Sequence, residues 1–314
     1  MRILFTGASS FTGMWFVEAL VRGGHSVTAV SRREQGVSSG LRAERLARVA
    51  ACSRTLWNAP FGSSRFLEII AQEEPFDILC HHGAETADYR SKEFDCVRAA
   101  AANTQSLPAV LRALSVSGCG RIILTGSIFE AGEGAGTPPL RAFNAYGLSK
   151  TLTSQMFEFY ARQEGVALGR FIVPNPFGPF EEPRFTDYLL RSWRDAKTAL
   201  VSTPRLVRDN IHVSLLSEIY CGFVQTLPRS GCHKISPSGY AESQGAFAER
   251  FAREIGARLN LETPLEMAKQ QIFEEPAIRV NTDVAPETEL GWDEGKAWDE
   301  LADYYAVRFD IERR

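Results

Sequence analysis

The sequence is poor in the residues that stabilise disulfide-rich secreted chains. It contains six cysteines among 314 residues, and no two of them form a CxxC pair. Neither their density nor their spacing fits a disulfide framework, so we expect reduced thiols, several of them buried. Histidine is also scarce, and only His81 and His82 are adjacent. Neighbouring residues of a strand point to opposite faces and no third ligand is suggested nearby, so we predict no metal site.

An excess of charge and a long apolar run are lacking as well. The formal net charge is −3 and the isoelectric point is near 6.0, which gives no reason to expect binding to nucleic acid or to a membrane. No apolar run reaches the ~18 residues that suggest a transmembrane helix. The first strand is expected to begin at residue 2, without a signal segment before it, so we expect a cytoplasmic location.

The N-terminus has the order of a dinucleotide-binding unit. Residues 1–5 form a short apolar run typical of a buried parallel strand, and the glycine-containing loop Thr6–Gly13 follows. A helical pattern then runs to Gly23-Gly24, and residues 25–30 read as a second strand. Small residues let the backbone approach a pyrophosphate, and the helix N-terminus offers N–H donors to it. The alternative is an ordinary strand–turn–helix connection without a ligand.

A tyrosine and a lysine four residues apart suggest the chemistry. Tyr146 and Lys150 lie on one face of a predicted helix. A free phenol loses its proton only near pH ~10, and a nearby ammonium group lowers that pKa, which gives a proton donor and acceptor usable near neutral pH. Ser127 lies upstream, after an apolar strand, and its hydroxyl could donate to a reacting oxygen. The alternative for Ser127 is a serine that caps a turn.

The end of the second strand bears on the choice of cofactor. An acidic residue there binds the ribose 2′-hydroxyl of NAD, whereas arginine accommodates the 2′-phosphate of NADP. The chain has Ser31-Arg32-Arg33, and its first acidic residue is Glu34. The sequence therefore favours NADP, with NAD left possible, unless the two arginines belong to a solvated basic loop.

Strands and helices alternate down to about residue 175. A helix is expected from about residue 94 to 114, with a kink at Pro108. A stripe of apolar residues on the Tyr146 helix is expected to serve as core or dimer interface: Leu148, Leu152, Met156 and Phe159. The length suits one large α/β domain with a smaller appended lobe.

These features together resemble one family. The chain is similar to the extended short-chain dehydrogenases/reductases, in the NAD(P)-dependent epimerase/dehydratase group that acts on nucleotide sugars. The family motifs resemble, in order, Thr6-Gly7 with Ser10 and Gly13, then His81-His82-Gly83-Ala84, Asn103, Ser127, Tyr146, Lys150, Asn175-Pro176-Phe177-Gly178-Pro179, Arg208-Asp209-Asn210-Ile211-His212-Val213 and Leu290-Gly291-Trp292. They cover nearly the whole chain.

The resemblance implies a Rossmann-type doubly wound parallel sheet with a smaller C-terminal substrate-binding lobe. Residues 1–175 and about 208–240 would form the dinucleotide-binding domain, and about 176–207 and 241–314 the lobe. The implied cofactor-binding residues are Gly7, Ser9, Ser10, Phe11, Thr12, Gly13, Ser31, Arg32, Arg33, Asn58, His81, Gly83, Ala84, Asn103, Tyr146, Lys150 and Pro174. The implied substrate-binding residues are Glu85, Ser127, Asn175 and Arg208. Ser127, Tyr146 and Lys150 would be catalytic, and the protein would be a homodimer.

Two departures from the family pattern matter. Ser10 replaces the middle glycine and adds a side chain beside the pyrophosphate, while Asn58 replaces an aspartate near the adenine.

The 4,6-dehydratases of the family carry Asp-Glu after the catalytic residue, where this chain has the apolar pair Ile128-Phe129, and this argues against dehydration. A nucleotide-sugar 4-ketoreductase and a 4-epimerase both remain open, with a non-catalytic NADP sensor as a minor alternative.

Overall fold

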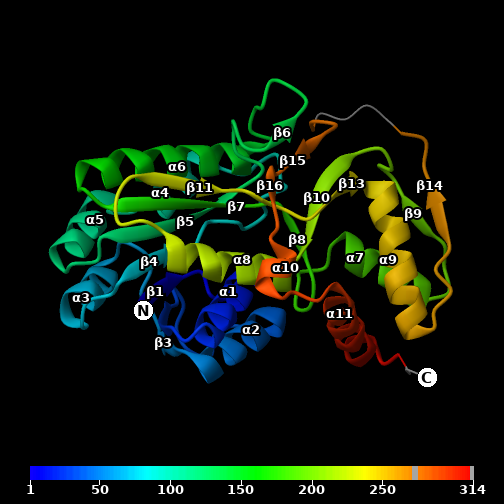
Figure 1. Ribbon diagram of the computed structural model, residues 1–314, viewed down its shortest axis with the longest axis horizontal. Helices are drawn as coiled ribbons and strands as arrows, with labels where there is room; N and C mark the ends of the chain where they lie inside the picture. The colour runs from blue at the N-terminus through cyan, green and yellow to red at the C-terminus, as the bar shows by residue number, and fades with distance from the viewer. Residues whose placement is uncertain (271–274, 312–314) are drawn as a thin grey trace. The chain divides into compact units, whose positions relative to one another are not determined.

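Seven parallel strands form the central sheet of the first of two units. The structure is a computed structural model that describes residues 1–270 and 275–311. In spatial order the strands are β11 (Cys232–Ile235), β7 (Ala167–Val173), β5 (Arg121–Ser127), β4 (Ile78–His81), β1 (Arg2–Thr6), β2 (Ser26–Val30) and β3 (Arg54–Leu56). The chain therefore runs outward from β1 to β3 and then crosses to the other side of β1 (Figure 1). Ligands of such sheets bind where the strand order reverses, at the carboxyl ends of the strands.

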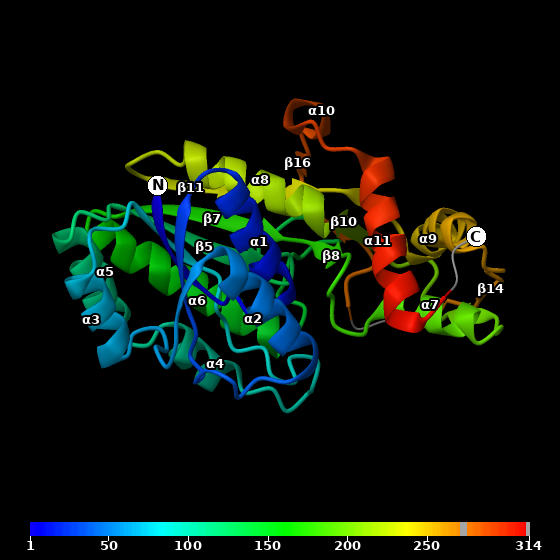
Figure 2. The same ribbon diagram turned by 90° about the horizontal axis from the view of Figure 1, so that it is seen from below.

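Helices cover both faces of this sheet (Figures 1 and 2). The helices α1 (Phe11–Arg22), α2 (Gly40–Cys52) and α8 (Val213–Thr226) group on one side. The helices α3 (Ser64–Gln72), α4 (Cys96–Asn103), α5 (Leu107–Val116) and α6 (Ala145–Gln163) group on the other. Apolar strand residues such as Ile3 and Leu79 are fully buried between these layers. The predicted Rossmann-type α/β fold is confirmed.

The expected single helix over residues 94–114 is wrong. The structure has two helices there, α4 and α5, separated by residues 104–106, and Ser106 adopts a left-handed conformation (φ 49°). Pro108 lies in the first turn of α5. Proline has no N–H to donate, and the first turn of a helix is where that N–H is not needed, so Pro108 starts a helix rather than bending one.

The second unit comprises residues 134–139, 174–216 and 237–314, and the first comprises 1–133, 140–173 and 217–236. Within the second unit, β8 (Asn175–Phe177), β10 (Val207–His212) and β13 (Tyr240–Ser243) form a three-stranded sheet. We expected the chain to rejoin the nucleotide-binding domain at about residue 208. Instead β10 pairs with β8 and β13, and the chain rejoins the main sheet only through α8 and β11.

The remaining elements of the second unit are short strand pairs and helices: β6 (Ala135–Gly136) with β15 (Arg279–Val280), β9 (Ala199–Val201) with β14 (Leu265–Met267), β12 (Pro237–Ser238) with β16 (Asp283–Val284), and the helices α7 (Phe185–Arg194), α9 (Gln244–Leu259), α10 (Glu287–Leu290) and α11 (Glu294–Phe309). This unit has its own apolar core, in which Phe247, Phe251 and Trp298 are almost completely buried. Each unit thus buries its own hydrophobic surface.

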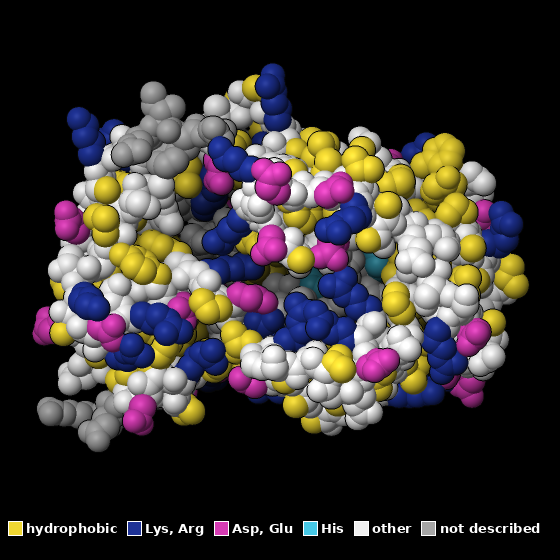
Figure 3. Space-filling view, turned by 180° about the vertical axis from the view of Figure 1, so that it is seen from behind, with side chains coloured by type: hydrophobic (Ala, Val, Ile, Leu, Met, Phe, Trp, Pro, Cys, Tyr) yellow, Lys and Arg dark blue, Asp and Glu magenta, His cyan; other side chains and the backbone are white. Residues whose placement is uncertain are grey.

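The molecular surface carries charges of both signs side by side, as Figure 3 shows for one face. This agrees with the small formal net charge of −3. Among the described residues, no helix is both long and apolar enough to cross a membrane.

Candidate active site

The glycine loop after β1 is shaped by close backbone contacts. Gly7 has φ 81°, and a Cβ atom there would lie 2.6 Å from the backbone nitrogen of Gly83, in the loop after β4. A Cβ atom on Gly13 would lie 2.2 Å from the carbonyl oxygen of Gly7. Only glycine fits either position, and the result is a tight turn that leads into the N-terminus of α1. These residues fit a dinucleotide pyrophosphate, which such a loop and helix N-terminus hold through N–H groups.

The side chain of Ser10 is engaged within this loop. Its hydroxyl caps α1 by accepting from the backbone N–H of Gly13 (3.0 Å), and it lies 3.0 Å from the carbonyl oxygen of Gly7. The ring of His82 bonds to the hydroxyls of Ser10 (3.0 Å) and Thr12 (3.1 Å) through Nε2. The departure from glycine at position 10 therefore adds hydrogen bonds to the loop, and His82 is the partner that accompanies it.

His81 is buried and His82 is half-buried, and both rings are uncharged near neutral pH. Burial, with a smaller effect of the Lys150 charge, lowers the pKa of each ring to about 3. Their rings face different surroundings, as the alternation along a strand requires. The Nε2 atom of His81 lies 3.3 Å from the carbonyl oxygen of Asn103, and its Nδ1 lies 2.9 Å from the Thr6 hydroxyl, whereas His82 reaches the glycine loop.

Asn103 joins three elements of the first unit. Its side-chain oxygen accepts from the backbone N–H of Glu85 (2.7 Å), in the loop that follows β4 with Gly83 and Ala84. Its amide nitrogen donates to the hydroxyl of Thr153 on α6 (3.3 Å). A residue that the family resemblance assigned to the cofactor edge thus ties α4 to α6 and to the loop after β4, and direct cofactor contact stays a prediction.

The predicted adenosine-ribose residues meet an acid from the loop after β4. The guanidinium of Arg32, after β2, forms an ion pair with the carboxylate of Glu85 at 3.0 Å. Burial opposes the charged form of Glu85, but the backbone N–H of Ala87 and the Arg32 guanidinium outweigh it and lower the pKa of the Glu85 carboxyl. Ser31 bonds to the backbone of Arg33, and the N–H of Asn58 donates to the carbonyl of Arg33 (3.0 Å). Glu85, expected among the substrate residues, therefore lies beside a residue predicted to bind the adenosine ribose.

The helix α6 carries the tyrosine and the lysine that we predict to be catalytic. The side chain of Asn144 caps its N-terminus by accepting from the N–H of Gly147 (2.9 Å), which fixes the start of the helix one residue before Tyr146. Lys150 is buried, and its ammonium group donates to the carbonyl oxygen of Thr125 at 2.6 Å. Thr125 precedes Ser127 by two residues on β5. Through this bond the lysine is joined to the strand that ends in the predicted catalytic serine.

A buried carboxylate, Glu130, supports this arrangement. It accepts from the backbone N–H of Ser127 (2.8 Å), from the hydroxyl of Ser154 on α6 (2.7 Å) and from the guanidinium of Arg170 (3.0 Å). Burial lowers the pKa of the Lys150 ammonium, the negative charge of Glu130 raises it, and Arg170 lowers it. Glu130 therefore positions the serine and favours the charged lysine.

The other predicted substrate residues lie in the second unit. Arg208, on β10, donates to the carbonyl oxygens of Val207 (2.8 Å) and Pro276 (2.9 Å) and to the carboxylate of Glu275 (2.9 Å). Asn175 follows Pro174 and pairs with Asn210 in the β8–β10 ladder. Their contact with a substrate stays a prediction.

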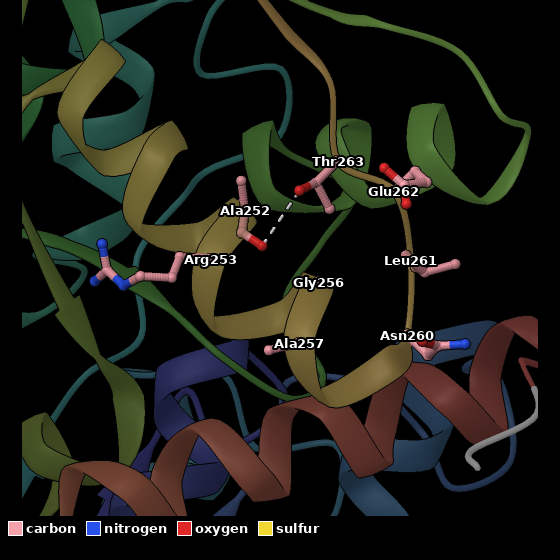
Figure 4. Close-up of a pocket in the computed structure, with 8 residues that line it drawn as sticks. All are labelled: Ala252, Arg253, Gly256, Ala257, Asn260, Leu261, Glu262 and Thr263. Atoms are coloured by element: carbon pink, nitrogen blue, oxygen red, sulfur yellow. Dashed lines mark hydrogen bonds between the residues drawn. The ribbon is translucent and has the colours of Figure 1, made fainter.

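A hollow of about 290 Å³ lies at the C-terminal end of α9 (Figure 4). Its lining residues are Ala252, Arg253, Gly256, Ala257, Asn260, Leu261, Glu262 and Thr263. None of the predicted site residues is among them, and it offers no grouping of catalytic side chains.

The sequence did not reveal Glu130, Thr125 or His82 as parts of the site. An acidic residue three positions after an apolar strand was a usable signal for Glu130, because an unpaired buried carboxylate is costly and implies partners. The pairing of His82 with Ser10 had no local signal, since their strand and loop are 72 residues apart.

The fold and the site define a class of protein. A parallel sheet with a glycine loop after β1 and a Tyr–Lys helix after β5 is the arrangement of the short-chain dehydrogenases/reductases. The sequence model of the family described as "NAD dependent epimerase/dehydratase family" matches residues 3–227. The chain belongs to this family.

Solved structures of similar fold belong to several sugar-nucleotide enzymes. A variant of the UDP-glucuronic acid 4-epimerase of Bacillus cereus is 14% identical, with 98% of this chain and 100% of that chain covered and a TM-score of 0.73. The dTDP-glucose 4,6-dehydratase of Streptomyces venezuelae is 18% identical (99% and 98% covered, TM-score 0.72). The UDP-glucose 4-epimerase of Thermotoga maritima is 16% identical (98% and 100% covered, TM-score 0.72). No curated protein sequence matches the chain.

Proposed function

We propose that this protein is an NADP-dependent 4-ketoreductase of a nucleotide-linked sugar. The observation that carries the proposal is one hydrogen bond. It joins Lys150, on the same helix as Tyr146, to the strand that ends in Ser127. A bound reduced nicotinamide would supply a hydride to the carbonyl carbon and become oxidised. Tyr146 would give its phenolic proton to the carbonyl oxygen, so that the ketone becomes a secondary alcohol, and solvent would restore the proton.

The other residues have supporting roles in this proposal. The hydroxyl of Ser127 would donate to the same oxygen as negative charge develops on it. Lys150 would favour the phenolate between turnovers and bind the nicotinamide ribose. Asn175 and Arg208 would contact the nucleotide diphosphate, for which a guanidinium is well suited.

The residues after Ser127 support reduction over dehydration. Ile128 is buried and Phe129 is half-buried, where the dehydratase pattern has two acids. The next carboxylate along the chain, Glu130, accepts hydrogen bonds from Ser127, Ser154 and Arg170. A carboxylate that already accepts from three donors has little lone-pair capacity left to take a proton from a sugar carbon.

A 4-epimerase is the second candidate, and the Arg32–Glu85 pair favours it. A carboxylate beside the expected adenosine ribose suits the 2′-hydroxyl of NAD, and the Bacillus cereus UDP-glucuronic acid 4-epimerase named above was solved with NAD. An epimerase would oxidise and re-reduce the same carbon. A non-catalytic sensor is disfavoured because both Tyr146 and Lys150 are present.

The test is to incubate the protein with reduced NADP and with nucleotide 4-ketosugars. A reductase forms one alcohol for each reduced cofactor consumed, which absorbance and nuclear magnetic resonance measure together. Interconversion of two alcohol epimers without net consumption of cofactor would favour the epimerase and overturn the reductase. Release of tightly held NAD from the purified protein would point the same way, and loosely held NADP would support the reductase.

We also propose that the protein is a homodimer that pairs through α4 and α6. Phe159 on α6 and Val97 on α4 are large apolar side chains, 61% and 71% exposed. Exposed apolar residues on neighbouring helices are typical of an interface.

A further inference from the structure

Four half-buried aromatic residues surround the catalytic tyrosine, and we call them the aromatic wall: Tyr89, Phe94, Phe129 and Phe143. The ring centroids of Tyr89, Phe94 and Phe129 lie 5.2, 6.1 and 6.3 Å from that of Tyr146. Phe143 stacks on Phe129 at 4.6 Å with an angle of 8° between the ring planes. The rings come from three separate segments of the chain, so the wall is a product of the fold.

The backbone of Phe129 is fixed against the start of α6. Its N–H donates to the hydroxyl of Ser127 (3.2 Å), and its carbonyl accepts from the N–H of Phe143 (3.1 Å). Gly147, the residue after Tyr146, packs on the same carbonyl, because a Cβ atom there would lie 2.2 Å from the Phe129 oxygen. Glycine at this position lets the helix approach, and the backbone of Phe129 is thereby fixed between Ser127 and the start of α6.

Tyr89 and Phe94 complete the wall from the segment between β4 and α4. The hydroxyl of Tyr89 accepts a hydrogen bond from the Nε atom of Arg90 (3.1 Å), so the polar end of the Tyr89 side chain already has a partner. Phe94 immediately precedes Asp95, whose side chain caps α4 by accepting from the N–H of Arg98 (2.9 Å). The position of Phe94 is therefore set by the start of a helix.

The wall selects against polar groups close to the reacting carbon. Because three of these rings pack around the Tyr146 side chain, we take the substrate atoms beside a carbonyl bonded to the Tyr146 hydroxyl to lie against them. A hydrocarbon group there is removed from water against ring carbons, which is favourable. A hydroxyl or carboxylate placed against the rings loses hydration without gaining a hydrogen bond, which is unfavourable.

We infer that the aromatic wall is a subsite for a hydrocarbon substituent on the ring carbon beside the reacting carbonyl. The substrate class is then a nucleotide-linked 4-keto-6-deoxy sugar, which carries a methyl group on that carbon, rather than a 4-ketosugar with a hydroxymethyl or carboxylate group there. This inference rests on the proposed function and deepens it. Phe129 is the specificity-determining residue, because its ring lies beside Tyr146 and its backbone is bonded to Ser127.

The experiment compares two nucleotide 4-ketosugars that differ only in a methyl or a hydroxymethyl group, with reduced cofactor in excess. An apolar pocket distinguishes such groups by about 10- to 100-fold, so we expect that ratio of kcat/KM in favour of the methyl compound. Phe129→Asn should bring the ratio close to one by offering a hydrogen bond to the hydroxymethyl group. Phe129→Leu keeps the surface apolar and should retain most of the preference.

Phe223 provides the matched control. It is a half-buried phenylalanine on α8 with an aromatic partner, Phe171, at 6.1 Å, and Phe223→Asn should leave the ratio unchanged. If Phe129→Asn does not fold, as judged by circular dichroism, Phe94→Asn makes the same test from the neighbouring segment. Equal kcat/KM for both compounds in the unmodified protein would overturn the subsite and leave the reductase standing. Failure to reduce either compound would overturn the proposed function itself.

Discussion

The ion pair between Arg32 and Glu85 allows the choice of cofactor to be tested by substitutions with opposite expected effects on NADP binding. If Arg32 and Arg33 bind a 2′-phosphate, the double change Arg32→Ala with Arg33→Ala should weaken NADP binding and leave NAD binding nearly unchanged. If Glu85 competes for the same guanidinium, Glu85→Gln should strengthen NADP binding relative to NAD. The lowered pKa of the Glu85 carboxyl means that it carries its negative charge at neutral pH, so it also repels a phosphate.

The expected magnitudes follow from exposure. A charge-assisted hydrogen bond contributes ~1.5–3 kcal/mol, and the Arg32 side chain is 53% exposed, which argues for the lower end. We expect at least a ~10-fold preference for NADP over NAD in the unmodified protein, lost in the double variant. An exposed ion pair is worth about 0.2–1 kcal/mol, so Glu85→Gln should raise the preference by about 1.5- to 5-fold.

Titration calorimetry with NAD and NADP on each variant measures these ratios. The exposed pair Arg54–Glu73 is the matched control, because it lies at the first residue of β3, the opposite end from the glycine loop, and Glu73→Gln should change neither affinity. Equal affinity of the unmodified protein for both cofactors, or a preference for NAD, would refute the reasoning and move the epimerase ahead of the reductase.

Three further predictions rest on other parts of the structure. Glu130→Gln removes the charge that raises the pKa of Lys150, so the alkaline limb of the pH–rate profile should move to lower pH, and an unmoved limb would exclude this role. Burial raises the pKa of Glu181 to about 8, so its contribution to stability is full below its unfolded pKa of about 4.5. That contribution, on the order of a few kcal/mol, is lost as pH rises toward 8. Chemical denaturation should show that the free energy of unfolding of Glu181→Gln lacks this pH dependence. The same pH dependence in the variant and the unmodified protein would contradict the prediction. Light scattering should give twice the 34.8 kDa chain mass, and Phe159→Glu should give monomers; a monomeric unmodified protein would rule the dimer out.

Local patterns predicted the parts of the fold that depend on neighbouring residues. The apolar run of β1, the glycine loop and the Tyr146–Lys150 spacing are each contained within a few residues, and the strands and helices around them form as expected. The break between α4 and α5 was missed because a proline in an apolar pattern indicates a kink as readily as a new helix.

Features that join distant strands could not be predicted in the same way. Arg32 and Glu85 are 53 residues apart and meet because β2 and β4 flank β1, so that their carboxyl ends are neighbours. The sequence also did not reveal that β10 pairs with β8 and β13. A sequence motif identifies the residues of a strand but not the strands beside it. The aromatic wall combines three segments, and only the folded chain shows that they meet.

The central claim is that Tyr146 transfers the proton, and Tyr146→Phe tests it most directly. The change removes one hydroxyl and leaves the ring in place among its aromatic neighbours, so the fold should persist by circular dichroism. Single-turnover reduction of a nucleotide 4-ketosugar should slow by about 10²–10⁴-fold, the usual contribution of a positioned proton donor. Reduction at close to the unmodified rate by a folded Tyr146→Phe protein would contradict the account.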